Sequence, residues 1–216
     1  MENPGAELAC HTYSHFYACE PGQTPEQFRA DLQAAKKAAE SVGGQLRSLV
    51  MPRNQVNPAY LPICQDEGFT SVRVNPKDWY WEIPPNVPVS LWKRLNRTAD
   101  AYLPIGHRKS YSLERIQCNA EEPWLIPASR FLRPYRPWQG LANEIRLRRV
   151  LREMEVAAEK NEVYHLWWHP HNFGSHPKES MEGMVRILKH FNLLQGKYGM
   201  VSMNMGELTA LLEQGK

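Results

Sequence analysis

The first 75 residues alternate between short apolar segments and segments with helical periodicity. Apolar residues gather over 6–10, 47–51 and 69–74, and each run is too short for a helix, so we predict three strands. Amphipathic segments over 24–43 and 57–68 separate them. This order is the pattern of right-handed parallel βαβ units, in which active sites lie at the carboxyl ends of the strands. The sequence therefore predicts an α/β fold with its site at that edge of the sheet.

The first of these helices carries the clearest local signals. Thr24 is a suitable N-cap, Pro25 stands at the first helical position and Gln27 at the third, which together form a capping box. Apolar residues then recur at helical spacing until Gly43-Gly44 interrupts the pattern. A helix is therefore expected between these two signals.

The chain is less regular between 76 and 140 and regular again after it. A structureless loop of this length is uncommon inside a compact domain, so we expect an ordered insertion between about 80 and 140. The elements expected from here on are a helix near 91–101, a strand around 125–131, a helix over 142–160, a strand over 162–168, a helix over 177–194, a strand over 200–203 and a helix from 206.

Composition restricts the class of protein. A chain of 216 residues with 42% apolar composition can bury one core, so 1–216 is expected to form a single domain. The net charge of +3, from 26 basic and 23 acidic residues, is too balanced for a nucleic-acid partner. No apolar run approaches the roughly 20 residues of a membrane span. The start of the chain lacks a secretory signal, and the four cysteines show no C-x-x-C spacing, so we expect a reducing, cytoplasmic location.

One local basic cluster stands out. Arg130, Arg133 and Arg136 lie within seven residues of each other in the expected insertion. Such a cluster can bind a phosphate or an anionic sugar, and the alternative is an ordinary solvated loop, because arginine is usually exposed.

Two histidines follow the first strand. His11 and His15 are four residues apart, so on a helical turn both imidazoles would face one metal ion. With eight histidines in 216 residues, roughly 0.3 such pairs arise by chance, so spacing alone is a weak signal. Their position after a strand favours a metal site; the alternative is two separate histidines bonded to backbone carbonyls.

A second histidine cluster ends the strand over 162–168. Alternation places His165, Trp167 and His169 on one face of the strand, with Leu166 and Trp168 on the other. A histidine at the mouth of a parallel sheet suits general acid or base catalysis. The tryptophans are either core residues or faces that stack on sugar rings.

Together with Pro52-Arg53-Asn54 and Asp78-Trp79, these segments resemble, in order, the motifs of the polysaccharide deacetylase family, also called the NodB homology domain or carbohydrate esterase family four. The resemblance extends from residue 5 to about 175. It implies that His11 and His15 are metal ligands, that His169 is the general acid and that Asp78 positions Arg53 in the groove. It also implies that the substrate contacts aromatic residues, here Trp79, Trp167 and Tyr13.

Three departures accompany this resemblance. The family's first motif, an Asp-Asp pair that supplies a third ligand and the catalytic base, has no counterpart before His11. Proline precedes Arg53, whereas the family has arginine first. The gap between Asp78 and His169 is long. The implied fold is a distorted (β/α)7 barrel, N-terminally truncated by its first strand, with the insertion between about 80 and 140.

The resemblance implies a metal-dependent hydrolase that removes acetyl groups from N-acetylated or O-acetylated sugars of a surface polysaccharide or glycan precursor. The cofactor would be a divalent metal, zinc first and cobalt or nickel otherwise, and the partner a carbohydrate. Because two histidines fall short of the usual three protein ligands, we expect weak metal affinity and little activity. The alternatives are an inactive carbohydrate-binding remnant of this fold and an unrelated α/β domain. An open barrel edge also predicts a homo-oligomer that covers it.

Overall fold

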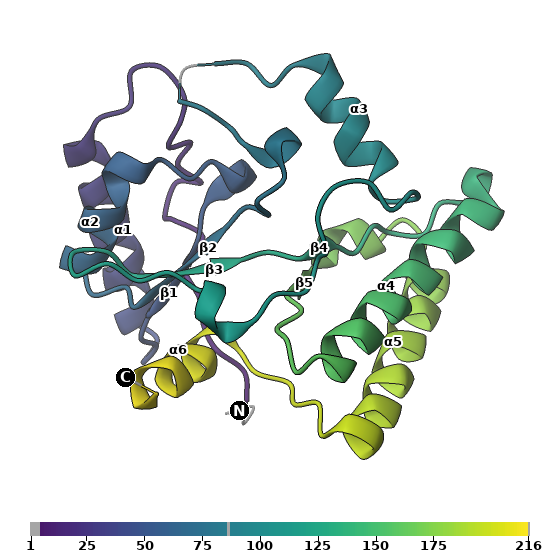
Figure 1. Ribbon diagram of the computed structural model, residues 1–216. Coiled ribbons are helices and arrows are strands. Elements are labelled where there is room, and N and C mark those ends of the chain that lie inside the picture. The colour runs from purple at the N-terminus through teal and green to yellow at the C-terminus, as the bar shows by residue number, and fades with distance from the viewer. Residues whose placement is uncertain (1–4, 86, 216) are drawn as a thin grey trace.

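The computed structural model describes residues 5–85 and 87–215, within which the chain forms six α-helices and five short strands (Figure 1). The helices are α1 Pro25–Glu40, α2 Leu61–Asp66, α3 Leu91–Ala99, α4 Leu141–Glu159, α5 Pro177–Tyr198 and α6 Met205–Gln214. The strands are β1 Ser48–Val50, β2 Ser71–Val74, β3 Trp124–Pro127, β4 Arg130–Phe131 and β5 Leu166–Trp167. The mixed α/β class expected from the sequence is confirmed.

The strands form two small parallel sheets that follow one another along a curve (Figure 1). β1, β2 and β3 lie in that order, and β4 pairs with β5. The chain bends between β3 and β4, where Ala128 N donates to the carbonyl of Val74 and Ser129 N donates to that of His165. Cys10 adds a parallel bridge to Leu49 on the far side of β1. The carboxyl ends of all these strands therefore meet at one edge.

The described residues do not form the distorted (β/α)7 barrel that the resemblance implies, even one that lacks its first strand. The segment 200–203, predicted as a strand, is irregular and makes no strand pairing, so that prediction is wrong. The segment 6–10 contributes only its bridge at Cys10. A strand exists only where a neighbouring backbone completes its hydrogen bonds, and these two segments lack such a neighbour on their open side. The sheet is consequently an arc.

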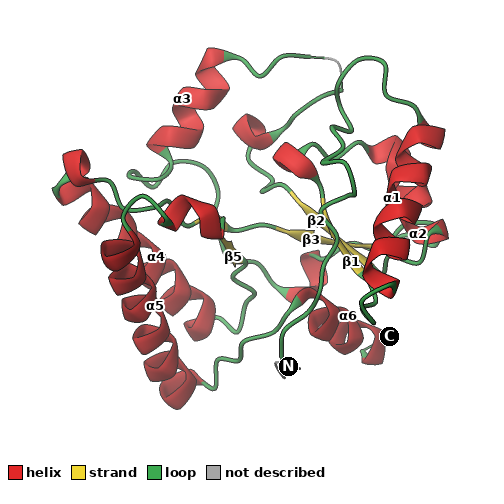
Figure 2. Cartoon of the chain, turned by 180° about the vertical axis from the view of Figure 1, so that it is seen from behind, coloured by secondary structure: helices red, strands yellow, loops and turns green. Residues whose placement is uncertain are grey.

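Helices cover the outside of this arc (Figure 2). The capping box at Thr24 and Gln27 forms as expected, and Phe28 and Leu32 of α1 are completely buried against β1 and β2 in the largest core cluster. Leu208 of α6 packs with Ile126 of β3. The facing apolar sides of α4 and α5 form a third cluster that also contains Leu166 of β5.

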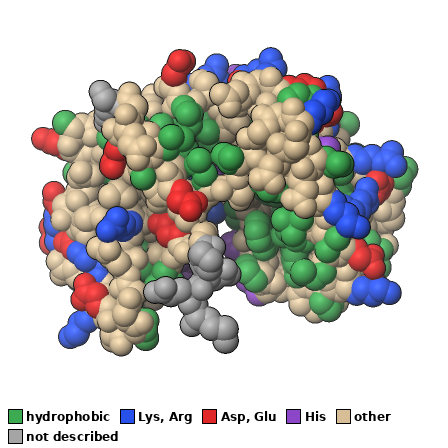
Figure 3. Space-filling view, turned by 90° about the horizontal axis from the view of Figure 1, so that it is seen from below, with side chains coloured by type: hydrophobic (Ala, Val, Ile, Leu, Met, Phe, Trp, Pro, Cys, Tyr) green, Lys and Arg blue, Asp and Glu red, His purple; other side chains and the backbone are tan. Residues whose placement is uncertain are grey.

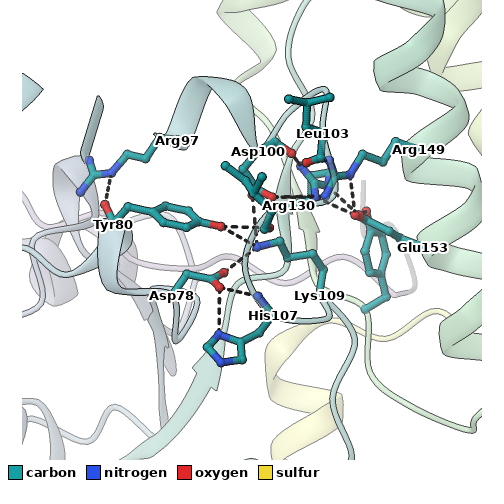
Figure 4. A network of polar contacts seen from close by, with 12 residues as sticks. Asp78, Tyr80, Arg97, Asp100, Leu103, His107, Lys109, Arg130, Arg149 and Glu153 are labelled. Atoms are coloured by element: carbon teal, nitrogen blue, oxygen red, sulfur yellow. Dashed lines mark hydrogen bonds and ion pairs between the residues drawn. The ribbon is translucent and has the colours of Figure 1, made fainter. Parts of the chain in front are cut away.

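The insertion between about 80 and 140 is ordered and is attached by buried ion pairs (Figure 4). Lys109 Nζ lies 2.5 Å from Asp78 Oδ2 and 3.1 Å from Asp100 Oδ2. Arg130 pairs with Glu153 of α4 through two hydrogen bonds of 2.5 and 2.6 Å, and it also donates to the carbonyl of Asp100. Because burying unpaired charge is costly, this network specifies where the insertion lies.

A cavity of about 460 Å³ lies between β3, β5 and the helices α4, α5 and α6. Its lining is mainly apolar, and Figure 3 shows hydrophobic side chains gathered beside the hollow. Trp168, Met200 and Met203 contribute to this lining, and Met203 is 45% exposed. None of the helices in 5–85 and 87–215 combines the length and hydropathy of a membrane-crossing segment.

Candidate functional site

The loop that carries His11 and His15 is not the helical turn assumed from their spacing. Thr12 and His15 have left-handed backbone conformations, with φ of 61° and 59°. Asp31 of α1 organises the loop: its carboxylate accepts hydrogen bonds from Tyr13 N at 2.6 Å and from Ser14 N at 2.9 Å, and a further one from the Ser14 hydroxyl. A buried carboxylate thus holds a strained loop that its local sequence alone would not adopt.

The two imidazoles nevertheless lie side by side. Their ring centroids are 5.0 Å apart at an interplanar angle of 65°. Nδ1 of His11 lies 2.7 Å from the carbonyl oxygen of Val50, at the end of β1. Because a carbonyl only accepts, Nδ1 carries the proton and Nε2 keeps its lone pair. Burial lowers the pKa of His11 by more than this hydrogen bond raises it. The neutral form of His11, which is the form that binds a metal, is therefore favoured.

This geometry fits two ligands of one metal ion. With metal–nitrogen bonds of about 2.0–2.1 Å and tetrahedral angles, two imidazole centroids would be separated by about 5.2 Å. The observed separation is 5.0 Å. A backbone carbonyl, here that of Val50, is also a usual hydrogen-bond partner of the second ring nitrogen of a zinc-bound histidine. Within the part of the chain that the structure describes, however, no three side chains of His, Cys, Asp or Glu converge on a metal position.

The second histidine cluster lies on β5 and the turn that follows it. Trp167 packs between Phe131 of β4, at 4.5 Å between centroids, and His169, at 5.4 Å. His171 stacks on His169 with a centroid distance of 5.2 Å. Leu166 and Trp168 line the apolar cavity, as strand alternation predicts, but His165 lines it as well, so the two faces are only partly separated.

Tertiary folding brings the two histidine clusters together. Burial lowers the pKa of His169, and the charges of His171, Arg73, His11 and His15 lower it further. His169 therefore lies within electrostatic range of the His11–His15 pair, although more than 150 residues separate them in the chain. The sequence prediction that both follow parallel strands accounts for this proximity.

Arg73 is a residue of this site that the sequence analysis did not select. Its guanidinium lies 4.3 Å from the ring centroid of Trp167, and its Nη2 donates to Asn54 Oδ1 at 2.8 Å. Among the described residues, no carboxylate lies within ion-pair distance of it. Burial lowers the pKa of Arg73 to about 10. A half-buried arginine without an acidic partner is suited to hold a negatively charged or carbonyl oxygen.

The Pro52-Arg53-Asn54 turn supports this site through its backbone. Arg53 and Asn54 both have left-handed conformations, with φ of 51° and 56°. The Arg53 guanidinium lies 4.1 Å over the ring of Tyr17, whose ring in turn contacts His15 at 5.2 Å. With Thr12 and His15, these are four of the five non-glycine residues of positive φ in the described chain. Backbone strain of this kind concentrates at functional sites.

Asp78 does not occupy the place that the family motif implies. Its side chain is buried, and it accepts hydrogen bonds from Lys109 and from the backbone and ring of His107. No ion pair joins Asp78 to Arg53 in the described residues. The structure thus gives Asp78 a role in anchoring the insertion, because the carboxylate is already used by Lys109.

The two remaining aromatic candidates are exposed. Trp79 is 54% exposed and makes an edge contact with Tyr80 at 5.7 Å, and Tyr13 is 65% exposed on the histidine loop. Exposed rings at the rim of a site are available to stack on a sugar. Of the two, Tyr13 adjoins the histidines in sequence.

Asp31 escaped the sequence analysis, and His165 was named there in the second histidine cluster but given no role. Asp31 lies among apolar residues on the inner face of α1. This position could have identified it from the sequence, because a carboxylate on a buried helix face needs hydrogen-bond partners. His165 was placed on the site face of its strand without a role. Burial and the charge of Arg73 lower its pKa to about 4, so it is neutral at physiological pH.

Comparisons of the chain with protein-family models, curated proteins and solved structures give no match. The assignment of a function therefore rests on the residues of this site and on the order of the sequence motifs.

Proposed function

We propose that this chain is a polysaccharide deacetylase-like protein, a metal-dependent hydrolase acting on N-acetylated or O-acetylated sugars of a surface polysaccharide or glycan precursor. The observation that carries the proposal is the side-by-side placement of His11 and His15, with the free nitrogen of His11 set by the Val50 carbonyl. His169 shares the same site. Histidines that converge from two strand ends are suited to metal-assisted hydrolysis.

In this proposal, His11 and His15 hold a divalent cation, with zinc first and cobalt or nickel as substitutes. A bound ion of this kind lowers the pKa of water and polarises a carbonyl. His169 is neutral at pH 7, because its pKa is lowered, and so it accepts the proton of the attacking water. It then donates that proton to the departing amine or alcohol oxygen, leaving acetate and the free sugar.

Arg73 and the aromatic side chains bind the substrate. The guanidinium of Arg73, which points into the site from β2 and lies against Trp167, donates to an oxygen of the acetyl group or of the sugar. Trp167 and Tyr13 provide ring faces for the pyranose. Trp79 would contact a longer substrate that extends toward the insertion.

An inactive carbohydrate-binding remnant is the second candidate. It is favoured by one observation, namely that no carboxylate joins the histidines as a third ligand within 5–85 and 87–215. Catalytic zinc normally has three protein ligands, so weak metal affinity and slow turnover are expected.

Elemental analysis of the purified chain tests the proposal directly. Because the site is expected to bind weakly, the protein is first equilibrated with excess zinc; the wild type should then bind about one cation per chain, and a His11→Ala and His15→Ala double variant none. His107→Ala combined with His190→Ala is the matched control, because it removes two histidines outside this site. Acetate release from N-acetylglucosamine oligomers and from acetylated xylan then distinguishes an enzyme from a remnant. Absence of metal from the wild type would refute the catalytic proposal.

A further inference from the structure

A second cleft, separate from the histidine site, lies between β4, α4 and α5. Its volume is about 350 Å³. Arg133, Tyr135, Asn143, Arg146 and Ser180 are among the residues that line it. Arg133 and Arg136 belong to the basic cluster noted in the sequence, which the proposed function does not use.

The arginines of this cleft differ in how they are paired. Arg130 is held by Glu153 and Arg186 by Glu144, so these two charges are neutralised. Arg133 and Arg146, by contrast, have no carboxylate within ion-pair distance in the described chain. Two guanidinium groups on the cleft wall are therefore without a counter-ion of their own.

Neutral oxygens hold these two arginines in place. Arg133 Nη2 donates to the carbonyl of Arg97 at 3.2 Å. Arg146 Nη2 donates to the Asn143 side chain at 2.5 Å and to the carbonyl of Pro134 at 3.3 Å. Fixed in this way, both guanidinium groups retain N–H donors that these bonds do not use.

Holding these charges together is unfavourable in the absence of an anion. Burial lowers the pKa of Arg133 and of Arg146, and repulsion from neighbouring guanidinium groups contributes to both shifts. Arg136 is one of the neighbours that acts on each of them. A bound anion would offset this repulsion.

A buried hydroxyl supplies an independent indication. Ser180, in the first turn of α5, lines the cleft and is 6% exposed, yet its Oγ has no hydrogen-bond partner among the described residues. Leaving a buried polar atom unpaired is costly, which indicates that a ligand completes it. Glu179 and Glu182 also line this cleft and are exposed. Carboxylates are good acceptors for sugar hydroxyl groups but repel a bare phosphate.

We propose that this cleft binds a sugar phosphate, whose phosphoryl group lies on Arg133 and Arg146 and whose hydroxyl groups reach Glu179 and Glu182. The combination of two unpaired arginines, an unpaired buried serine and exposed carboxylates in one cleft fits such a ligand and does not fit a neutral sugar. The inference does not rest on the metal site, so binding persists after the protein has been treated with a chelator.

Isothermal titration calorimetry of the whole chain with glucose 6-phosphate, inorganic phosphate and glucose tests this inference. Glucose 6-phosphate is expected to bind most tightly, inorganic phosphate more weakly and glucose not at all. The Arg133→Gln and Arg146→Gln double variant should weaken binding of glucose 6-phosphate at least about tenfold. Arg47→Gln combined with Arg115→Gln removes two exposed guanidinium groups elsewhere and should leave binding unchanged.

A milder variant keeps the test decisive if the double variant does not fold. Ser180→Ala removes only one buried oxygen and should weaken binding about threefold to tenfold with little change in melting temperature. Failure of wild type to bind either phosphate compound would overturn the inference. So would equal affinity in Ser180→Ala and wild type, or equal binding of glucose and glucose 6-phosphate.

Discussion

Replacing Lys109 by methionine probes the buried network that attaches the insertion to the sheet. The ammonium group lies 2.5 Å from Asp78 Oδ2 and 3.1 Å from Asp100 Oδ2, and the three side chains are 3–5% exposed. Methionine has a similar volume but no charge, so the change leaves two carboxylates buried without their shared cation.

The expected loss of stability follows from this geometry. Removing one partner of a buried ion pair costs about 3–5 kcal/mol. For a chain of this size, each kcal/mol lowers the melting temperature by about 2–4 °C, so a decrease of about 6–20 °C is expected. Lys178→Met is the matched control, because Lys178 is exposed on α5, and it should change the melting temperature by less than about 2 °C.

The pH dependence gives a second readout with a definite sign. Burial by itself raises the pKa of Asp78, but hydrogen bonds from Lys109 and His107 outweigh it and lower the pKa below its ordinary value. In wild type, Asp78 therefore adds stability above its unfolded pKa, and this is lost as pH falls through its folded pKa. Without Lys109, burial dominates and the pKa rises. Acid then neutralises the buried carboxylate in the variant.

Thermal melting followed by circular dichroism from pH 7 to pH 4 measures both effects. The difference in melting temperature between wild type and Lys109→Met should narrow as pH falls. Adding Asp78→Asn to Lys109→Met should recover part of the lost stability at pH 7, since one stranded charge is gone. A decrease smaller than about 2 °C, or a difference that widens in acid, would refute the role given to this network.

Three other predictions concern the site and the packing of α4 on α5. Asp31→Asn should lower the free energy of unfolding by about 2–3 kcal/mol, because a carboxylate that accepts several hydrogen bonds is lost. It should also abolish metal binding, and a variant that still binds metal would contradict the role given to Asp31. Asp66→Asn, at an exposed carboxylate, is the control. Arg73→Gln should leave the melting temperature unchanged or raise it, since a half-buried charge is removed. It should lower kcat/KM at least about tenfold. A large fall in melting temperature would show that Arg73 stabilises the fold and would contradict a role in binding the substrate. Glu144→Gln should cost at most about 1 kcal/mol at pH 7, because its partner Arg186 is partly exposed. Hydrogen bonds from Arg186 and Arg148 lower the pKa of Glu144 to about 2. The difference in stability between wild type and Glu144→Gln should therefore disappear as pH falls from about 4.5 toward this pKa. If the difference persists at that pH, the ion pair between Glu144 and Arg186 is not its cause.

Several elements follow directly from local sequence. The capping box at Thr24 and Gln27 forms, and α1 ends before Gly43-Gly44, because capping and helix termination depend on neighbouring residues. β1 and β2 form within the apolar runs that predicted them. The strand predicted at 200–203 does not form, since its formation depends on a partner strand that the local sequence does not specify.

The candidate site was predictable only in part. His11, His15 and His169 were selected because they follow predicted strands, and the structure places the rings of His11 and His15 side by side, within electrostatic range of His169. Asp78 was assigned to that site by its motif, yet Lys109, 31 residues later, takes its carboxylate. Such a pairing depends on how the insertion folds back, which no local pattern reveals.

The sequence by itself determined the α/β class, the helices, part of the strands, and the appearance of histidines at strand ends, because each depends on periodicity and capping over a few residues. Only the tertiary structure decided that the sheet is an open arc, that Asp31 shapes the histidine loop and that Arg73 joins the site. These features depend on hydrogen bonds and charges between segments far apart in the chain, which exist only once the backbone has folded.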